Sequence, residues 1–135
     1  MRKKIVITSI ITCIIVVILI VFLWKKTIIN MNFLENGKLI FCYDDIYIKE
    51  SCTEEELAII FDIFNNKLLY KDNPSCGFSD EISIKINDEQ TFCLACDSCS
   101  IIFWKEKQKY FKVSEEEMNQ LHKIFEQYGA TFPCV

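Results

Sequence analysis

The feature that most constrains this chain is an apolar run near its N-terminus. Ile5 to Trp24 ("IVITSIITCIIVVILIVFLW") contains no charged residue. At about 1.5 Å per residue, a helix of that length crosses a hydrocarbon core of roughly 30 Å, so the run predicts a transmembrane helix. A cleaved secretory signal has a shorter apolar region, of roughly 7 to 15 residues, and Thr12 is a poor residue before a lipidated Cys13. We therefore expect residues 1–26 to be a plain, uncleaved membrane anchor with basic flanks.

The charges on either side of the run predict its orientation. Arg2, Lys3 and Lys4 precede it, whereas Lys25 and Lys26 follow it. Basic residues favour the cytoplasmic side of a membrane. We expect a single-pass protein of the cell membrane, with its N-terminus in the cytoplasm and its domain outside the cytoplasm.

The remainder of the chain is acidic. Five of the 15 Lys and Arg residues flank the apolar run, which leaves 10 against all 19 Asp and Glu residues, a balance of about −9. Nucleic acids and anionic lipid surfaces attract basic proteins, so this composition argues against a nucleic-acid partner and predicts a domain that stands off the bilayer. The chain has 3 glycines and lacks a Gly-rich phosphate loop, which argues against a bound nucleotide.

Two amphipathic helices are predicted by the same N-terminal signal. Thr53-Glu54-Glu55-Glu56 and Ser114-Glu115-Glu116-Glu117 each place a hydroxyl at the cap and a Glu three residues later, which is a capping box. Apolar residues at helical spacing follow each box, as far as Phe64 in the first helix and Tyr128 in the second. The acidic triplets stabilise the positive end of a helix dipole, so they need no catalytic role.

Between the two helices the pattern changes to that of β-strands. Residues 81–87 ("EISIKIN") alternate strictly, with three Ile side chains on one face. Turn-forming residues then separate three further strand-like segments, at 90–96, 100–104 and 109–113. The sequence therefore predicts a four-stranded antiparallel meander.

A short hairpin is predicted ahead of the first helix, because residues 39–43 and 46–49 flank Asp44-Asp45. Helices packed on one face of an antiparallel sheet would bury both apolar stripes together with the Ile face. We therefore expect an α+β domain over residues 37–135, joined to the anchor by a juxtamembrane segment, residues 27–36.

Seven cysteines lie beyond the predicted anchor: Cys42, Cys52, Cys76, Cys93, Cys96, Cys99 and Cys134. Outside the cytoplasm, disulfides form and persist. In the predicted meander the chain around Cys76 runs beside the turn that holds Cys99, so we expect a Cys76–Cys99 disulfide or, alternatively, Cys76–Cys96. Antiparallel helices would bring Cys52 near Cys134, which makes Cys52–Cys134 the second candidate disulfide.

The segment from Cys93 to Cys99 ("CLACDSC") leaves two other chemistries open. A metal site formed by Cys76, Cys93, Cys96 and Cys99 is one alternative, although Phe103 stands where a ferredoxin-like run would place its next cysteine. A thiol–disulfide redox protein is the other, although the sequence predicts no helix after Cys93 or Cys96 to stabilise a thiolate. The favoured interpretation includes no catalytic residue, metal or cofactor.

Aromatic residues on the predicted meander indicate a binding surface. Phe103 and Trp104 point to opposite faces of one strand, and Tyr110 and Phe111 do so on the next. An outward-facing aromatic patch on the sheet is therefore predicted, and such patches bind proteins. The alternative is a second small core beneath residues 36–49.

Four blocks of the domain look specific as a set: "DNPSCGFSDEISIKIN", "TFCLACDSCSII", "KYFKVSEEE" and "YGATFPCV". With their CGF, CxxCDxC and FPCV motifs, they resemble blocks of small, membrane-anchored or exported bacterial proteins that have no assigned function. The resemblance covers most of the domain. It implies no activity, cofactor or site.

The sequence thus predicts a membrane-anchored protein that displays a small disulfide-containing domain. We expect the domain to bind a neighbouring protein or an envelope component without catalysing a reaction. A further alternative, which the size and anchoring of the protein permit, is that it inhibits a membrane-acting toxin or enzyme or protects against one. The single histidine, His122, is predicted to be an ordinary residue on a helix surface, because no nucleophile is near it in sequence.

Overall fold

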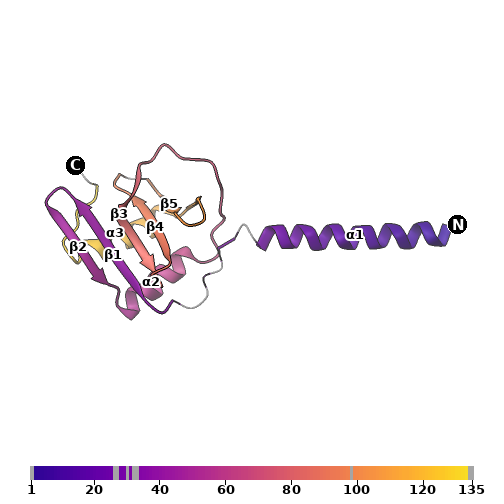
Figure 1. Cartoon of the computed structure of the whole chain (residues 1–135), viewed down its shortest axis with the longest axis horizontal. Coiled ribbons are helices and arrows are strands. Elements are labelled where there is room, and N and C mark those ends of the chain that lie inside the picture. Colours follow the sequence, from indigo (N-terminus) through magenta and orange to yellow (C-terminus); the bar gives the residue numbers. More distant parts are fainter. Residues whose placement is uncertain (1, 26–27, 30, 32–33, 98, 134–135) are drawn as a thin grey trace.

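The structure is a computed structural model that describes residues 2–25, 28–29, 31, 34–97 and 99–133. A long N-terminal helix, α1 (Arg2–Lys25), extends away from an α+β domain (Figure 1). The domain elements follow in the order β1 (Gly37–Tyr43), β2 (Ile46–Ser51), α2 (Glu54–Phe64), β3 (Phe78–Ile86), β4 (Gln90–Ala95), β5 (Ile101–Trp104), β6 (Lys109–Lys112) and α3 (Glu115–Glu126).

Helix α1 is long and apolar enough to cross a membrane. Its segment Val6–Leu23 has a mean hydropathy of 3.3, and 0% of it is buried against the rest of the protein. The helix coincides with the apolar run that the sequence singles out.

Helices α2 and α3 begin where the capping boxes predict. The Thr53 hydroxyl accepts a hydrogen bond from the Glu56 backbone, and the Glu56 carboxylate accepts one from the Thr53 backbone at 2.7 Å. Ser114 and Glu117 repeat the same pair of hydrogen bonds at the start of α3. Each box satisfies two backbone N–H groups that the first helical turn would otherwise leave without a partner.

The strands form one six-stranded antiparallel sheet in the order β2-β1-β3-β4-β5-β6. The predicted hairpin and meander are therefore not separate units, because β1 pairs with β3 along Leu39↔Ile84 and Phe41↔Ile82. Strand β3 also begins at Phe78, earlier than the sequence predicts, and its register with β4 shifts between Phe78 and Ser83. This irregularity breaks the strict alternation from which a strand is recognised.

Both helices pack on one face of the sheet, and the domain core lies between them and the strands. Phe64 of α2 lies 4.7 Å from Phe92 of β4, and Phe125 of α3 lies 6.4 Å from Phe41 of β1, between ring centroids. The Tyr128 hydroxyl, after α3, donates to the buried Glu56 carboxylate of α2 at 3.1 Å. That hydrogen bond connects the two helices at the edge of the core.

The core includes residues from the predicted juxtamembrane segment. Ile29 and Met31 are 1% and 6% exposed. The Ile29 backbone N–H donates to the Lys67 carbonyl, and the Asn66 N–H donates to the Ile29 carbonyl, both at 2.9 Å. The chain is thus held in the domain from Ile28–Ile29 onward, close to the end of α1.

Candidate functional site

The CLACDSC segment closes the turn between β4 and β5. Of the two pairings that the sequence leaves open for Cys76, the structure contains Cys76–Cys99, with an S–S distance of 2.01 Å. This bond joins the long segment after α2 to the β4–β5 turn. Cys96, which follows β4, is disulfide-bonded as well.

The predicted Cys52–Cys134 disulfide is wrong, because Cys52 is a free thiol. Its sulfur packs beneath Gly37, 3.0 Å from where a Cβ would stand on that glycine. Burial, together with the Glu56 charge, raises the pKa of the Cys52 thiol to about 12, so the thiol stays protonated. Cys134 lies outside the described residues.

The state of the cysteines bears differently on the metal and redox alternatives, because a metal site needs free thiolates whereas a disulfide is also the oxidised form of a redox pair. Of the four candidate ligands, Cys76, Cys96 and Cys99 are in disulfides. Cys93 is 1% exposed, and its sulfur donates a weak hydrogen bond to Asp80 Oδ1 at 3.8 Å. Burial first, and then the Asp80 charge, raise the pKa of the Cys93 thiol to about 12. Such a thiol is a poor nucleophile and a poor metal ligand.

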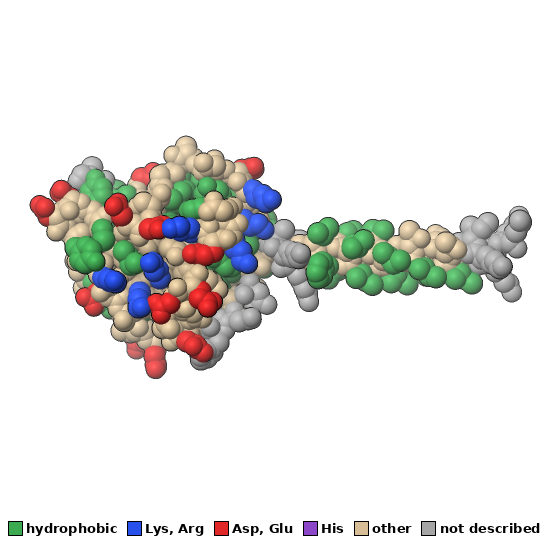
Figure 2. All heavy atoms as spheres, viewed as in Figure 1, with side chains coloured by type: hydrophobic (Ala, Val, Ile, Leu, Met, Phe, Trp, Pro, Cys, Tyr) green, Lys and Arg blue, Asp and Glu red, His purple; other side chains and the backbone are tan. Residues whose placement is uncertain are grey.

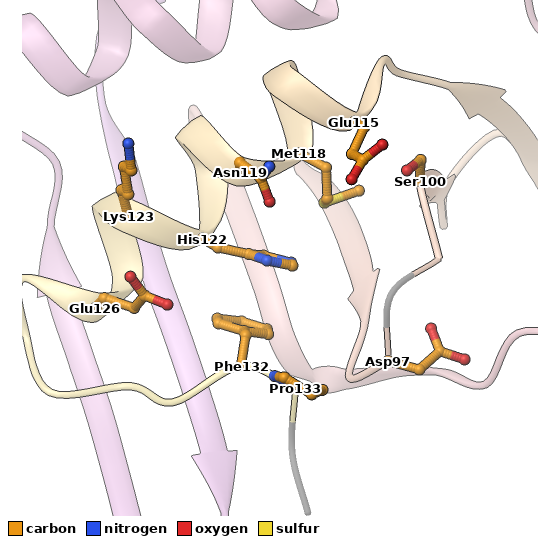
Figure 3. A pocket seen from close by; sticks show the side chains of 10 residues that line it. All are labelled: Asp97, Ser100, Glu115, Met118, Asn119, His122, Lys123, Glu126, Phe132 and Pro133. Atoms are coloured by element: carbon orange, nitrogen blue, oxygen red, sulfur yellow. The ribbon is translucent and has the colours of Figure 1, made fainter.

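A cavity of about 590 Å³ lies between α3 and two neighbouring segments. Figure 3 shows side chains from α3, from the turn after β4 and from the segment after α3 around it. The lining residues are Asp97, Ser100, Glu115, Met118, Asn119, His122, Lys123, Glu126, Phe132 and Pro133. One wall, at Asp97, is part of the CLACDSC segment, so the Cys76–Cys99 disulfide helps to fix the shape of the cavity.

His122 lies in this cavity and is not the ordinary surface residue that the sequence predicts. Its ring stacks on Phe132, with centroids 4.0 Å apart and planes 4° from parallel. Burial lowers the pKa of His122, and the Glu126 charge opposes this effect. Its Nε2 atom is buried and has no hydrogen-bond partner among the described residues.

The lining of the cavity is acidic. Its lining includes three carboxylates, from Asp97, Glu115 and Glu126, against the single ammonium of Lys123, so the local charge favours a cationic group. Over the part of the chain that is described, no hydrogen bond pairs His122 with a Ser or Cys side chain, which a nucleophilic couple requires.

The aromatic side chains on the other face of the sheet are largely covered. Phe78, Phe103 and Tyr110 form a cluster with centroid separations of 4.9 to 5.9 Å. Tyr70 joins the cluster from the segment after α2, at 6.0 Å from Tyr110. Trp104 faces the helices, as its 5.1 Å contact with Phe92 shows. The outward aromatic surface predicted from the sequence is thus half-buried, beneath the segment after α2 and not beneath residues 36–49.

The two edges of the sheet differ. At the β6 edge, Tyr110 exchanges two backbone hydrogen bonds of 2.9 Å with Tyr70, so the segment after α2 covers that edge. Strand β2 is the other edge strand. It carries Tyr47, which is 74% exposed, and Tyr43 of β1, 41% exposed, stands near it at the end of the hairpin.

No known protein family matches this chain, and neither a curated protein nor a solved structure is significantly similar to it.

Proposed function

We propose that this chain is a single-pass membrane protein that displays its α+β domain outside the cytoplasm, where the domain binds an extended segment of a protein partner at the β2 edge. The exposed side chains of α1 support the anchor. Its large apolar residues are 48% to 61% exposed. A helix that is apolar on all sides and covered by nothing else in the protein needs a nonpolar medium around it.

The disulfide supports the location of the domain. Bonds such as Cys76–Cys99 persist in oxidising compartments and are rare in the cytosol. The excess of basic residues before α1, at Arg2, Lys3 and Lys4, favours the same orientation.

The observation that carries the binding proposal is the exposed backbone of β2. The Cys52 N–H donates to the Gly37 carbonyl at 2.8 Å, so these two residues form a hydrogen-bonded pair of the β1–β2 ladder. Hydrogen-bonded and non-hydrogen-bonded pairs alternate along an antiparallel ladder. The backbone groups of Tyr47, Lys49 and Ser51 therefore point away from the sheet and can pair with an added strand.

Strand β2 carries two exposed charged side chains, Lys49 and Glu50, as partial protection, but it lacks other protections of an edge strand. The strand contains no Pro, and its pairing with β1 runs without a register shift from Ser51 to Ile46. Pro residues, bulges and covering loops are common protections of exposed edges. The covering loop is present at β6 instead, through Tyr70. This contrast favours β2 as the edge that accepts a partner.

Site-specific photo-crosslinking in native membranes tests the binding site. A benzoylphenylalanine in place of Tyr47 should give a defined crosslinked protein, because Tyr47 is 74% exposed and its backbone groups point outward from the open edge. The matched control is the same residue in place of Lys112, which lies on the covered β6 strand. Equal crosslinking patterns at the two positions would contradict binding at the β2 edge.

Intact mass after alkylation tests the compartment. The chain has eight cysteines, and Cys13, Cys42, Cys52 and Cys93 are free in the structure. Protein unfolded without reductant should therefore take up alkyl groups on these four thiols but fewer than eight in total, and reduced protein should take up eight. Eight groups without reduction would indicate a cytoplasmic, reduced domain.

The redox and metal alternatives predict different results. A redox pair in CLACDSC should become reactive in folded protein after mild reduction, whereas a structural bridge should resist such reduction. Zinc or iron bound in stoichiometric amount after purification under reducing conditions would favour the metal alternative.

A further inference from the structure

The path of the chain fixes which part of the domain lies next to α1. Helix α1 ends at Lys25, and Ile28 forms a β-bridge with Leu68. Three residues span at most about 11 Å when fully extended, and bridged residues lie roughly 5 Å apart. Leu68 is therefore within roughly 16 Å of the last residue of α1.

Leu68 is a well-exposed aliphatic residue close to the end of α1. It is 60% exposed, whereas Ile59, the other exposed aliphatic side chain in the described part of the domain, is 38% exposed. Its neighbour Leu69 is 9% exposed and packs in the core. Because side chains alternate along an extended segment, Leu68 points away from the core.

The surroundings of Leu68 are less acidic than the rest of the domain. Lys67 and Lys71 flank it, and Tyr70 pairs with Tyr110 at the start of β6, next to the β5–β6 turn. That turn carries Lys105 and Lys107. Figure 2 shows Lys side chains gathered, on the face drawn, at the end of the domain nearest α1.

Not all of this positive charge is available to a ligand. Lys67 pairs with Glu117 at 2.6 Å, and Lys105 pairs with Asp80. Lys71 and Lys107 are exposed, and Lys107 stands over the Trp104 ring at 5.8 Å. Asp72 and Glu106 stand next to these two lysines in sequence, so the local charge is close to zero whereas the domain as a whole is acidic. Lysines next to an anchor are attracted to anionic headgroups, and here the excess of acidic charge that would repel those headgroups is absent.

We propose that Leu68 inserts into the headgroup region of the bilayer, with Lys71 and Lys107 on anionic lipids beside it, and that this second contact sets the orientation of the domain. The inference rests on the proposed anchoring of α1. It replaces the expectation from net charge that the whole domain stands off the membrane. The β6 edge then faces the bilayer, and β2, five strand spacings of about 4.8 Å away, lies about 24 Å further out.

Lipid quenching of a fluorescent amino acid in the full chain tests this contact. The chain is reconstituted in vesicles of phosphatidylcholine and phosphatidylglycerol, with or without brominated acyl chains, and the probe replaces Leu68, Tyr47 or Ile15 in separate samples. Brominated lipid should quench the probe at position 68 at least threefold more than the probe at position 47. Aqueous iodide should quench the two positions in the opposite order.

The probe at Ile15 separates the two proposals. Strong quenching at positions 15 and 68 supports both. Strong quenching at position 15, with equal weak quenching at 68 and 47, would overturn the Leu68 contact and leave the anchor intact. Absence of lipid quenching at position 15 would overturn the anchor itself.

A substitution tests whether Leu68 makes the contact. With the probe at Lys71, Leu68→Glu should reduce quenching by brominated lipid at least twofold, because a carboxylate at that position opposes insertion near anionic lipid. The matched control is Ile59→Glu, on the exposed face of α2, which should leave the quenching unchanged. Both side chains are exposed, so neither change removes a core residue. Equal effects of the two substitutions would refute a specific role for Leu68.

Discussion

Removal of the Cys76–Cys99 disulfide should destabilise the domain by an amount that follows from the loop it closes. The two cysteines are separated by 23 residues in sequence. The chain-entropy relation for a loop of this size gives about 3.4 kcal/mol at 25 °C. For a domain of this length, that loss lowers the melting temperature by roughly 15 °C.

The measurement is denaturant unfolding of the full chain in detergent, followed by the change in tryptophan fluorescence. Trp104 is 8% exposed in the core and reports on the domain, whereas the other tryptophan, Trp24, lies in α1. The perturbed protein carries Cys76→Ala and Cys99→Ala together, so that no unpaired thiol remains from the pair. The matched control is Cys42→Ala, which removes a free, partly exposed thiol and should cost much less.

A loss below about 1 kcal/mol in the double variant would refute the entropic reasoning, since it would mean that the unfolded chain gains little freedom when the bridge is absent. A loss equal to that of Cys42→Ala would refute it as well. In either case the bridge would have to be explained by local order at the β4–β5 turn.

Three further predictions concern the second disulfide, the helix contact and the cavity. Cys96 is disulfide-bonded, and every other described cysteine is either free or in the Cys76–Cys99 bond, so Cys134 is the predicted partner of Cys96. Peptide mapping without reduction should find a Cys96–Cys134 pair, and a Cys96 peptide joined to another cysteine would contradict this prediction. Tyr128→Phe should lower the free energy of unfolding by about 1 to 2 kcal/mol in urea, because it removes a hydrogen bond to the buried Glu56 carboxylate, and an unchanged value would contradict that role. Burial lowers the pKa of His122 below 6.5, so on acidification the unfolded state binds a proton before the folded state does, and the free energy of unfolding should fall as the pH drops below about 6.5. His122→Gln should lose this part of the pH dependence, and an identical dependence of the free energy of unfolding on pH in the variant would refute the assignment.

The helices and most strands were predictable because their signals are local. A capping box is complete within four residues, and both α2 and α3 begin directly after Thr53 and Ser114. The alternation from Ile82 to Ile86 also gives the correct buried face. The joining of β1 to β3 was not predicted, because that pairing connects residues about 45 positions apart and leaves no mark in either segment.

The cavity was not predictable for a related reason. Its walls at Asp97, His122 and Phe132 come from three separate segments, and only tertiary packing brings them together. One signal was present: His122 lies four residues after Met118 and three before Phe125, both buried, so it borders the apolar stripe of α3. The expected pairing of Cys52 failed because it assumed a helix arrangement without accounting for the close contact of Cys52 with Gly37.

The proposed membrane contact and the proposed binding edge depend on each other. The buried Ile29 holds the domain near the end of α1, but a tether at one point still permits the domain to tilt. If the domain lay flat, the β2 edge and Tyr47 would come close to the bilayer, and headgroups would compete with a protein strand for that edge. With Leu68 in the headgroup region, the same edge is held about 24 Å further from the membrane than β6. Leu68→Glu should therefore reduce crosslinking of a partner through position 47 although the two residues lie at opposite ends of the sheet. Undiminished crosslinking, together with lost lipid quenching at position 71, would show that the edge binds its partner in any orientation of the domain.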